Sequence, residues 1–132
     1  MKSSDCFILV SSFDKYAACW DPFLHGLKKY WPEHPPVFFI TNELDPPDGS
    51  AIKVGKDRGW GANLKYALDQ LDSEYLLYSK EDYWIQKPVN ETLITDYLEL
   101  LCKEKADYIR LYPAPPPDIP YPDDERLGII HS

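Results

Sequence analysis

Two adjacent carboxylates, Glu81 and Asp82, interrupt an apolar run and are the first residues whose types suggest chemistry. The run reads LLYSKEDYWI from Leu76 to Ile85, so a stretch typical of a buried strand stops at two charges and then resumes. Burying an unpaired carboxylate is costly unless a partner compensates the charge. The pair therefore predicts either a position that faces such a partner or an ordinary solvated turn.

The segment GKDRGWGANL, Gly55 to Leu64, suggests a second kind of chemistry. Gly59 and Gly61 precede or open a predicted helix, and Lys56 and Arg58 lie beside them. Free backbone amides, the positive end of a helix dipole and two cations together favour a phosphate contact. Glycines before a helix are also common as simple turn residues, and that alternative stays open.

The order of apolar runs predicts the fold that would position these groups. Strands are predicted at Cys6–Ser12, Val37–Thr41, Ala51–Val54, Tyr75–Ser79 and Tyr108–Tyr112. Helices are predicted from Asp21, with Pro22 in the first turn, from Trp60, and from the N-cap Asn90. We therefore expect an α/β fold, an open, mostly parallel twisted sheet with helices on both faces and right-handed crossovers.

Polar side chains follow three of the predicted strands. They are Ser11, Ser12, Phe13, Asp14, Lys15 and Tyr16 after the first strand, Thr41, Asn42 and Glu43 after the second, and Lys80, Glu81, Asp82 and Tyr83 after the fourth. In open α/β sheets, ligands bind outside the carboxyl ends of the strands. We expect the three sets to converge on one edge of the sheet.

These segments, taken in order, resemble the nucleotide-sugar-binding half of a glycosyltransferase of the A-type fold. The matching segments are SSFDKY, TNE, GWGANLKYAL and YLLYSKEDYW, within roughly residues 5 to 112. The resemblance implies a Rossmann-like nucleotide-diphospho-sugar transferase fold and a UDP- or GDP-sugar as donor. The acidic motif of the family, D-x-D or D-D, reads E-D-Y here.

The resemblance also implies roles for individual residues. Asp82 matches the Asp that contacts a divalent metal, Mn²⁺ or Mg²⁺, which bridges the diphosphate of the donor. Glu81 matches the neighbour that contacts the ribose or a metal-bound water. The remaining donor-binding positions are Ser11, Phe13 and Tyr16 around the base, Asn42 or Glu43 hydrogen-bonded to it, and Arg58 with Gly59 near the diphosphate or base.

The resemblance assigns no catalytic base, because the family continues for about another hundred residues that supply the acceptor site. We expect a glycosyltransferase domain, or its donor-binding half, in residues 1–112, followed by a proline-rich extended tail in residues 113–132. The alternative is a non-catalytic α/β binding or protein-interaction module. Transfer to an acceptor hydroxyl belongs to the first hypothesis only.

Composition excludes some classes of partner. Among 132 residues, 14 Lys and Arg stand against 22 Asp and Glu, a formal charge of -8. Such a chain repels nucleic acid and anionic membranes on average. The opening MKSSDCFILVSS has an apolar run too short for a signal peptide or a membrane span, so we expect no transmembrane segment and a cytoplasmic location.

Three further expectations concern residues without an assigned role. The cysteines, Cys6, Cys19 and Cys102, are expected to be buried and reduced. Four aromatic residues are expected in the core because they fall on apolar periodic positions: Trp60, Tyr66, Trp84 and Tyr97. The histidines, His25, His34 and His131, have no mutual spacing that indicates a metal site.

Overall fold

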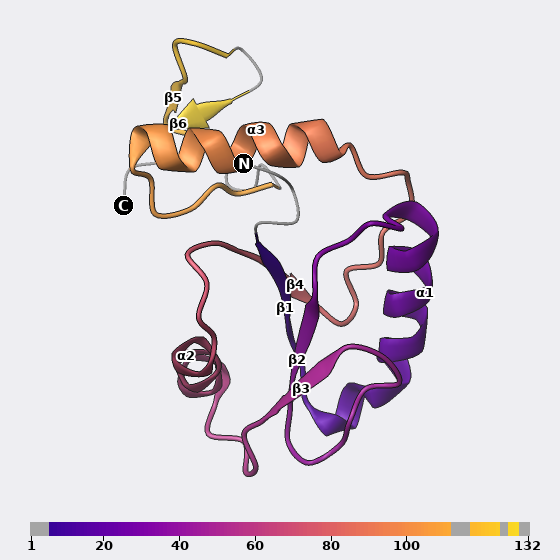
Figure 1. Ribbon diagram of the computed structural model, residues 1–132. Helices are drawn as coiled ribbons and strands as arrows, with labels where there is room; N and C mark the ends of the chain where they lie inside the picture. Colours follow the sequence, from indigo (N-terminus) through magenta and orange to yellow (C-terminus); the bar gives the residue numbers. More distant parts are fainter. Residues whose placement is uncertain (1–5, 112–116, 125–126, 130–132) are drawn as a thin grey trace. The chain divides into compact units, whose positions relative to one another are not determined.

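The computed structural model describes residues 6–111, 117–124 and 127–129 (Figure 1). By its internal contacts the chain divides into two compact units, Met1–Glu99 and Leu100–Ser132. The first unit contains the sheet and all the residues that the sequence marks as a site. The expected division between an α/β domain and a tail at residue 112 stays a prediction.

A four-stranded parallel sheet forms the centre of the first unit. Its strands are β1 (Phe7–Ser11), β2 (Val37–Thr41), β3 (Ser50–Lys53) and β4 (Leu76–Lys80), in the order β3-β2-β1-β4. The predicted α/β class with a parallel sheet is thus confirmed, and the strand bounds differ from the prediction by at most one residue. β1 is a nearly continuous apolar run because it has a strand on each side and a helix over each face.

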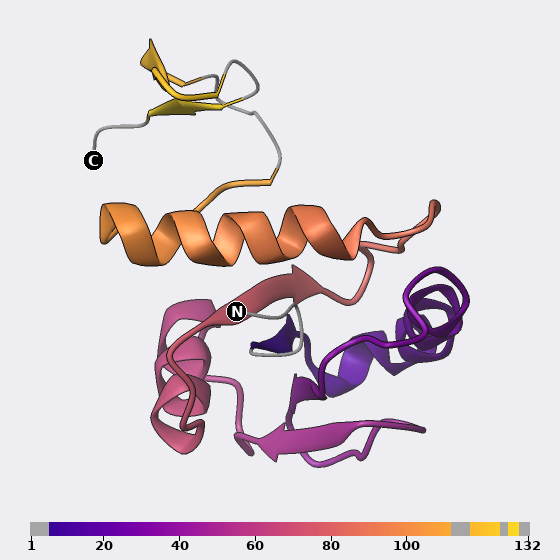
Figure 2. The same ribbon diagram turned by 45° about the horizontal axis from the view of Figure 1, so that its top comes forward.

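Helices cover both faces of this sheet. A 3₁₀ segment, η2 (Asp14–Cys19), leads into α1 (Trp20–Tyr30); α2 is Trp60–Gln70 and α3 is Glu91–Glu104. Figures 1 and 2 show α1 and α2 on opposite sides of the strands. The connections β1-α1-β2 and β3-α2-β4 cross the sheet in opposite directions, so a common handedness places their helices on opposite faces.

Strand alternation divides the core into two layers. Ile8 and Val10 of β1 pack under α1 with Trp20 and Phe39. The intervening residues Phe7 and Leu9 face the other way, in a cluster with Ile40, Ile52 and Ala67 of α2. Each β1 residue therefore contributes to one layer only, as the two-residue period of a strand requires.

The helix ends follow the sequence signals closely. α1 begins at Trp20, one residue before the predicted start, and Pro22 lies in its first turn. Asn90 caps α3, since the Leu93 N–H donates a hydrogen bond to Asn90 Oδ1 at 3.1 Å.

The second unit corrects one expectation and contains a strand pairing that the sequence did not predict. Residues 108–111 form no strand, and Tyr112 lies outside the described residues. Alternation alone did not suffice, because a strand needs a ladder partner, and Tyr108 and Leu111 are more than half exposed. Within the tail, β5 (Ile119–Pro120) and β6 (Gly128–Ile129) pair as a short antiparallel ladder.

A tyrosine in this unit has an altered acidity. Tyr121 donates a hydrogen bond to Glu104 Oε1 at 3.0 Å, and Asp123 lies beside it. Desolvation, together with these two acidic neighbours, raises the pKa of Tyr121 to about 12.

The cysteine expectation is wrong for two of the three residues. Cys6 is buried, but Cys19 is half-buried and Cys102 is exposed, and none of the three forms a disulfide. Within the described ranges, every helix is too short or too polar to span a bilayer.

Candidate functional site

The carboxyl ends of the four parallel strands lie at one edge of the sheet and carry the residues that the sequence singled out. β1 connects through α1 to β2 on one side, whereas β4 lies on the other side of β1. The order of strands therefore reverses between β1 and β4. In doubly wound sheets, this switch point is where ligands bind.

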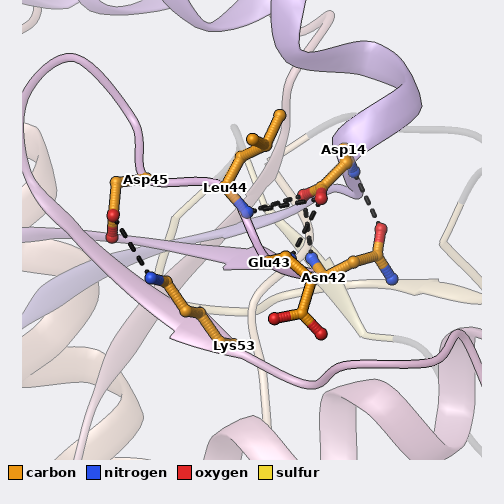
Figure 3. Close-up of polar contacts among 6 residues, drawn as sticks. All are labelled: Asp14, Asn42, Glu43, Leu44, Asp45 and Lys53. Carbon is orange, nitrogen blue, oxygen red and sulfur yellow. Dashed lines mark hydrogen bonds and ion pairs between the residues drawn. The ribbon is translucent and has the colours of Figure 1, made fainter.

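Asp14 ties together the loops that follow β1 and β2 (Figure 3). Its carboxylate accepts hydrogen bonds from the backbone N–H groups of Asn42 and Glu43 at 3.0 Å each, and of Leu44 at 3.3 Å. In return, the Asp14 N–H donates to Asn42 Oδ1 at 2.9 Å. The sequence showed Asp14 only as one of several polar residues after a strand, and its clamping role was missed.

Asn42 extends the same network to β3. Its Nδ2 donates to the Gly55 carbonyl at 2.8 Å, and the Gly55 N–H donates to the Asn42 carbonyl at 3.1 Å. The Asn42 amide thus uses its oxygen and its nitrogen to hold neighbouring loops. The next residue, Glu43, is exposed, so of the two predicted base contacts its side chain is the more accessible.

Two aromatic rings lie beside the end of β1. The Phe13 and Tyr16 ring centroids are 4.7 Å apart and tilted, and Tyr16 is 40% exposed. Ser11 ends the strand and is half-buried. These three predicted donor-binding residues therefore come together at the same strand end, with an aromatic surface open to solvent.

The turn before α2 is closed by a pair of side chains that the sequence did not reveal. Asp57 Oδ1 accepts hydrogen bonds from the Gly59 N–H and from Asn63 Nδ2, both at 2.8 Å. Asn63 Oδ1 accepts the Arg58 N–H at 3.3 Å, and Asn63 is buried. Gly59 has φ +98°, a conformation that favours glycine. The sequence feature that could have revealed this closed turn is Asp57, an Asp two residues before the glycine that precedes the helix.

The start of α2 still exposes backbone donors. In the part of the chain that the structure describes, the Trp60, Gly61 and Ala62 N–H groups have no hydrogen-bond partner. No atom lies within 4 Å of a Cβ built on Gly61, so this face is open. Arg58 places its guanidinium 5.8 Å from the Tyr66 ring centroid. The exposed amides and the Arg58 guanidinium favour binding of an anion at the start of α2, whereas the negative charge of Asp57 disfavours it.

Two tryptophans expected in the core are on the surface, and Tyr66 is exposed as well. Trp60 is 62% exposed and its Nε1 donates to the Tyr78 hydroxyl at 2.6 Å. Trp84 is 48% exposed and its Nε1 donates to the Glu81 carbonyl at 2.9 Å. Trp60 begins its helix and Trp84 lies in the segment after β4, so neither belongs to a continuous buried stripe.

Glu81 and Asp82, the pair that interrupts the apolar run, have different environments. Asp82 is exposed, whereas Glu81 is only 7% exposed. The buried Glu81 Oε2 has no hydrogen-bond partner among the described residues. An unsatisfied buried polar group costs about 1–3 kcal/mol, and more when it is charged. The energetic difficulty read from the sequence is therefore present in the structure, and it resides at Glu81.

Thr41 Oγ1 is also buried and has no hydrogen-bond partner in the described part of the chain, and the register aligns it with Glu81. Ser11 of β1 pairs with Ile40 and with Lys80, so one step further Ser12 is level with Thr41 and Glu81. Ser12 Oγ accepts the Trp20 Nε1–H at 2.9 Å. Strand alternation thus predicts a row of buried polar groups on the α1 side of the switch point, with unsatisfied atoms at both ends.

A divalent metal at this position would have few protein ligands. Among the residues with described positions, no three His, Cys, Asp or Glu side chains gather as a metal site. Mg²⁺ and similar cations in nucleotide sites commonly use one or two carboxylates together with substrate phosphates. The two carboxylates at this position differ in exposure, since Glu81 is buried and Asp82 is exposed.

Comparison with known proteins adds no assignment. No family model, no curated protein and no solved structure matches the chain. The case for a function therefore depends on the residues at the edge of the sheet.

Proposed function

We propose that this chain is a glycosyltransferase domain, or the donor-binding half of one, with a Rossmann-like nucleotide-diphospho-sugar transferase fold. The observation that carries the proposal is Glu81, a buried carboxylate with an unpartnered oxygen at the switch point of a parallel sheet. Polar groups that are buried without partners require an explanation, and ligand binding is one. The resemblance of four ordered segments to this family supports the same assignment.

In this proposal, Asp82 and Glu81 hold Mn²⁺ or Mg²⁺. The cation, when bound, neutralises charge on the diphosphate of the donor. The exposed amides at the start of α2 and the Arg58 guanidinium stabilise the same anion from the protein side.

The base of a UDP- or GDP-sugar lies against the Phe13 and Tyr16 rings, with Glu43 as the accessible hydrogen-bonding side chain. The diphosphate leaves from the anomeric carbon and an acceptor hydroxyl attacks that carbon. The proton of the hydroxyl passes to a base that the chain does not identify.

Calorimetry with UDP, GDP and CDP, each with and without Mn²⁺, tests the proposal. We expect one nucleotide to bind in the presence of Mn²⁺ and its affinity to fall at least tenfold when the metal is chelated. Failure of all three nucleotides to bind would refute donor binding.

A non-catalytic α/β module is the second candidate, and one observation favours it. Asp14 and Asn42, two of the polar residues at strand ends, direct their side chains to neighbouring backbone groups. In this second candidate, the polar residues at the strand ends serve to hold the loops in fixed positions and do not contact a ligand. Nucleotide binding separates the two candidates.

A further inference from the structure

A surface groove lies in the first unit between α1 and the segment that follows β4. It has a volume of about 470 Å³ and is open to solvent. The backbones of α1 and of the segment after β4 are closely packed at the bottom of the groove, because a Cβ added to Gly26 would lie 3.0 Å from the Ile85 carbonyl oxygen. The segment therefore lies directly against the helix backbone, and the side chains on either side rise around the contact.

The polar lining of the groove is available and nearly balanced in charge. The side chains of Asp21, His25 and Gln86 have no hydrogen-bond or ion-pair partner within the described ranges. Lys29 lies at the same groove and places its Nζ 5.1 Å from the Tyr30 ring centroid. One carboxylate and one ammonium group offset each other, so the groove favours neither a phosphate nor a metal ion. Because most of the exposed lining is apolar, the groove favours a neutral ligand that combines an apolar surface with a few hydrogen-bonding groups.

The groove also contains an aromatic surface that is held in place. Trp84 uses its indole N–H for a hydrogen bond to the Glu81 carbonyl at 2.9 Å, which fixes the ring by its edge. The residue remains 48% exposed and lines the groove. A large, rigid aromatic ring provides contact area at a small cost in conformational entropy.

We propose that this groove binds a saccharide. A pyranose ring has a face of C–H groups that stacks on an aromatic ring, and hydroxyl groups around its rim. A carboxylate accepts hydrogen bonds from such hydroxyls, whereas amide and imidazole groups both accept hydrogen bonds from them and donate hydrogen bonds to them. Trp84 supplies the stacking surface, and Asp21 and Gln86 supply hydrogen bonds.

The Trp84 hydrogen bond to Glu81 connects the groove to the candidate donor site. In the proposed function, the groove contributes one saccharide contact to the acceptor site, beside the residues that follow in the family, and that role rests on the proposed function. Saccharide binding itself depends only on the lining of the groove.

The four tryptophans provide the test, because each gives one indole N–H signal in a ¹⁵N-correlated NMR spectrum. The full chain is titrated with methyl α-glucopyranoside, methyl β-galactopyranoside and methyl α-mannopyranoside. We expect a saturable shift of the Trp84 signal with at least one glycoside. Trp60 is the matched control, since it is exposed but does not line the groove.

Variants then test whether binding depends on stacking against Trp84 in particular. In these variants the glycoside affinity is measured from the shift of the Gly26 backbone N–H signal, because Gly26 lines the groove. W84A is expected to weaken glycoside binding about tenfold or more, W84F less, and W60A not at all. Absence of a saturable Trp84 shift with all three glycosides would overturn the inference, as would equal shifts at Trp60.

A nucleotide titration on the same sample separates this inference from the proposed function. Nucleotide binding without a glycoside shift contradicts only the groove. A glycoside shift without nucleotide binding supports the groove and contradicts its acceptor role.

Discussion

Similar polar residues follow β1, β2 and β4. Those in the loops after β1 and β2 have hydrogen-bond partners, whereas Glu81 in the turn after β4 has an oxygen without one among the described residues. In the loops, Asp14 receives three backbone N–H groups and Asn42 bridges to Gly55. In the turn, Glu81 is buried and one of its oxygens receives nothing from the described residues. A polar residue at a strand end is therefore not by itself evidence of a binding site.

The two regions differ in whether their polar side chains have hydrogen-bond partners. A satisfied polar group holds loops together and contributes to stability, whereas an unsatisfied one reduces stability and is retained where a ligand compensates it. Mutations at the two regions should therefore have opposite effects on stability.

The largest expected effect is the loss of the Asp14 clamp. D14A removes the acceptor for three backbone N–H groups, and we expect the free energy of unfolding to fall by about 3 kcal/mol. Urea denaturation followed by circular dichroism measures the change. Asp45 provides the matched control in the same loop, because its only described contact is an exposed ion pair with Lys53 at 3.2 Å (Figure 3). D45A should change stability by less than about 0.5 kcal/mol.

Asn42 should show a smaller loss. N42A removes one hydrogen bond to the Asp14 N–H and one to the Gly55 carbonyl, at 2.9 and 2.8 Å. We expect a decrease of about 2 kcal/mol in the free energy of unfolding. In a double-mutant cycle with D14A the losses should be less than additive, since the two residues share a network. Simple additivity would show that they act independently.

Glu81 is expected to change stability in the opposite direction. E81Q keeps the shape of the side chain and removes a buried charge, so we expect the free energy of unfolding to rise by about 1 kcal/mol. The same variant should lose Mn²⁺-dependent nucleotide binding. A destabilised E81Q would show that Glu81 has a compensating partner in the free protein and would remove the contrast between the two regions.

Asp82 should have the smallest effect on stability. The residue is exposed, so D82N is expected to change the free energy of unfolding by less than about 0.5 kcal/mol. If Asp82 contacts the metal, Mn²⁺-dependent nucleotide binding should nevertheless be lost, because the amide is uncharged. Unchanged metal-dependent affinity in calorimetry would remove Asp82 from the site.

Much of the fold was predictable because it depends on local periodicity. β2 and the Asn90 cap of α3 were predicted correctly from apolar pattern and capping residues. Tyr108 and its neighbours were assigned wrongly, since alternation does not reveal whether a ladder partner exists. Trp60 and Trp84 were assigned to the core because an aromatic residue near a periodic stripe resembles a core residue.

The site was less predictable for a different reason. The sequence located Glu81 and Asp82 as an unusual pair, and the family resemblance assigned the metal contact to Asp82. The burial of Glu81 depends on the alternation of the strand before the pair, which the sequence analysis did not use. The clamps at Asp14 and Asp57 depend on loops that approach in space, and Asp14 and Asn42 are 28 residues apart in the chain. Their partners cannot be read from local pattern.

The position of β1 also affects how the first unit folds during synthesis. Among the four strands of the parallel sheet β1 is made first, yet one of its two neighbours, β4, is made last, with Phe7 opposite Leu76. Until Lys80 has emerged, the apolar central strand can pair on one side only. Pairing of distant segments is slow, and an unpaired apolar edge promotes aggregation. Efficient production of this chain should therefore depend on a chaperone that shields β1 until β4 arrives.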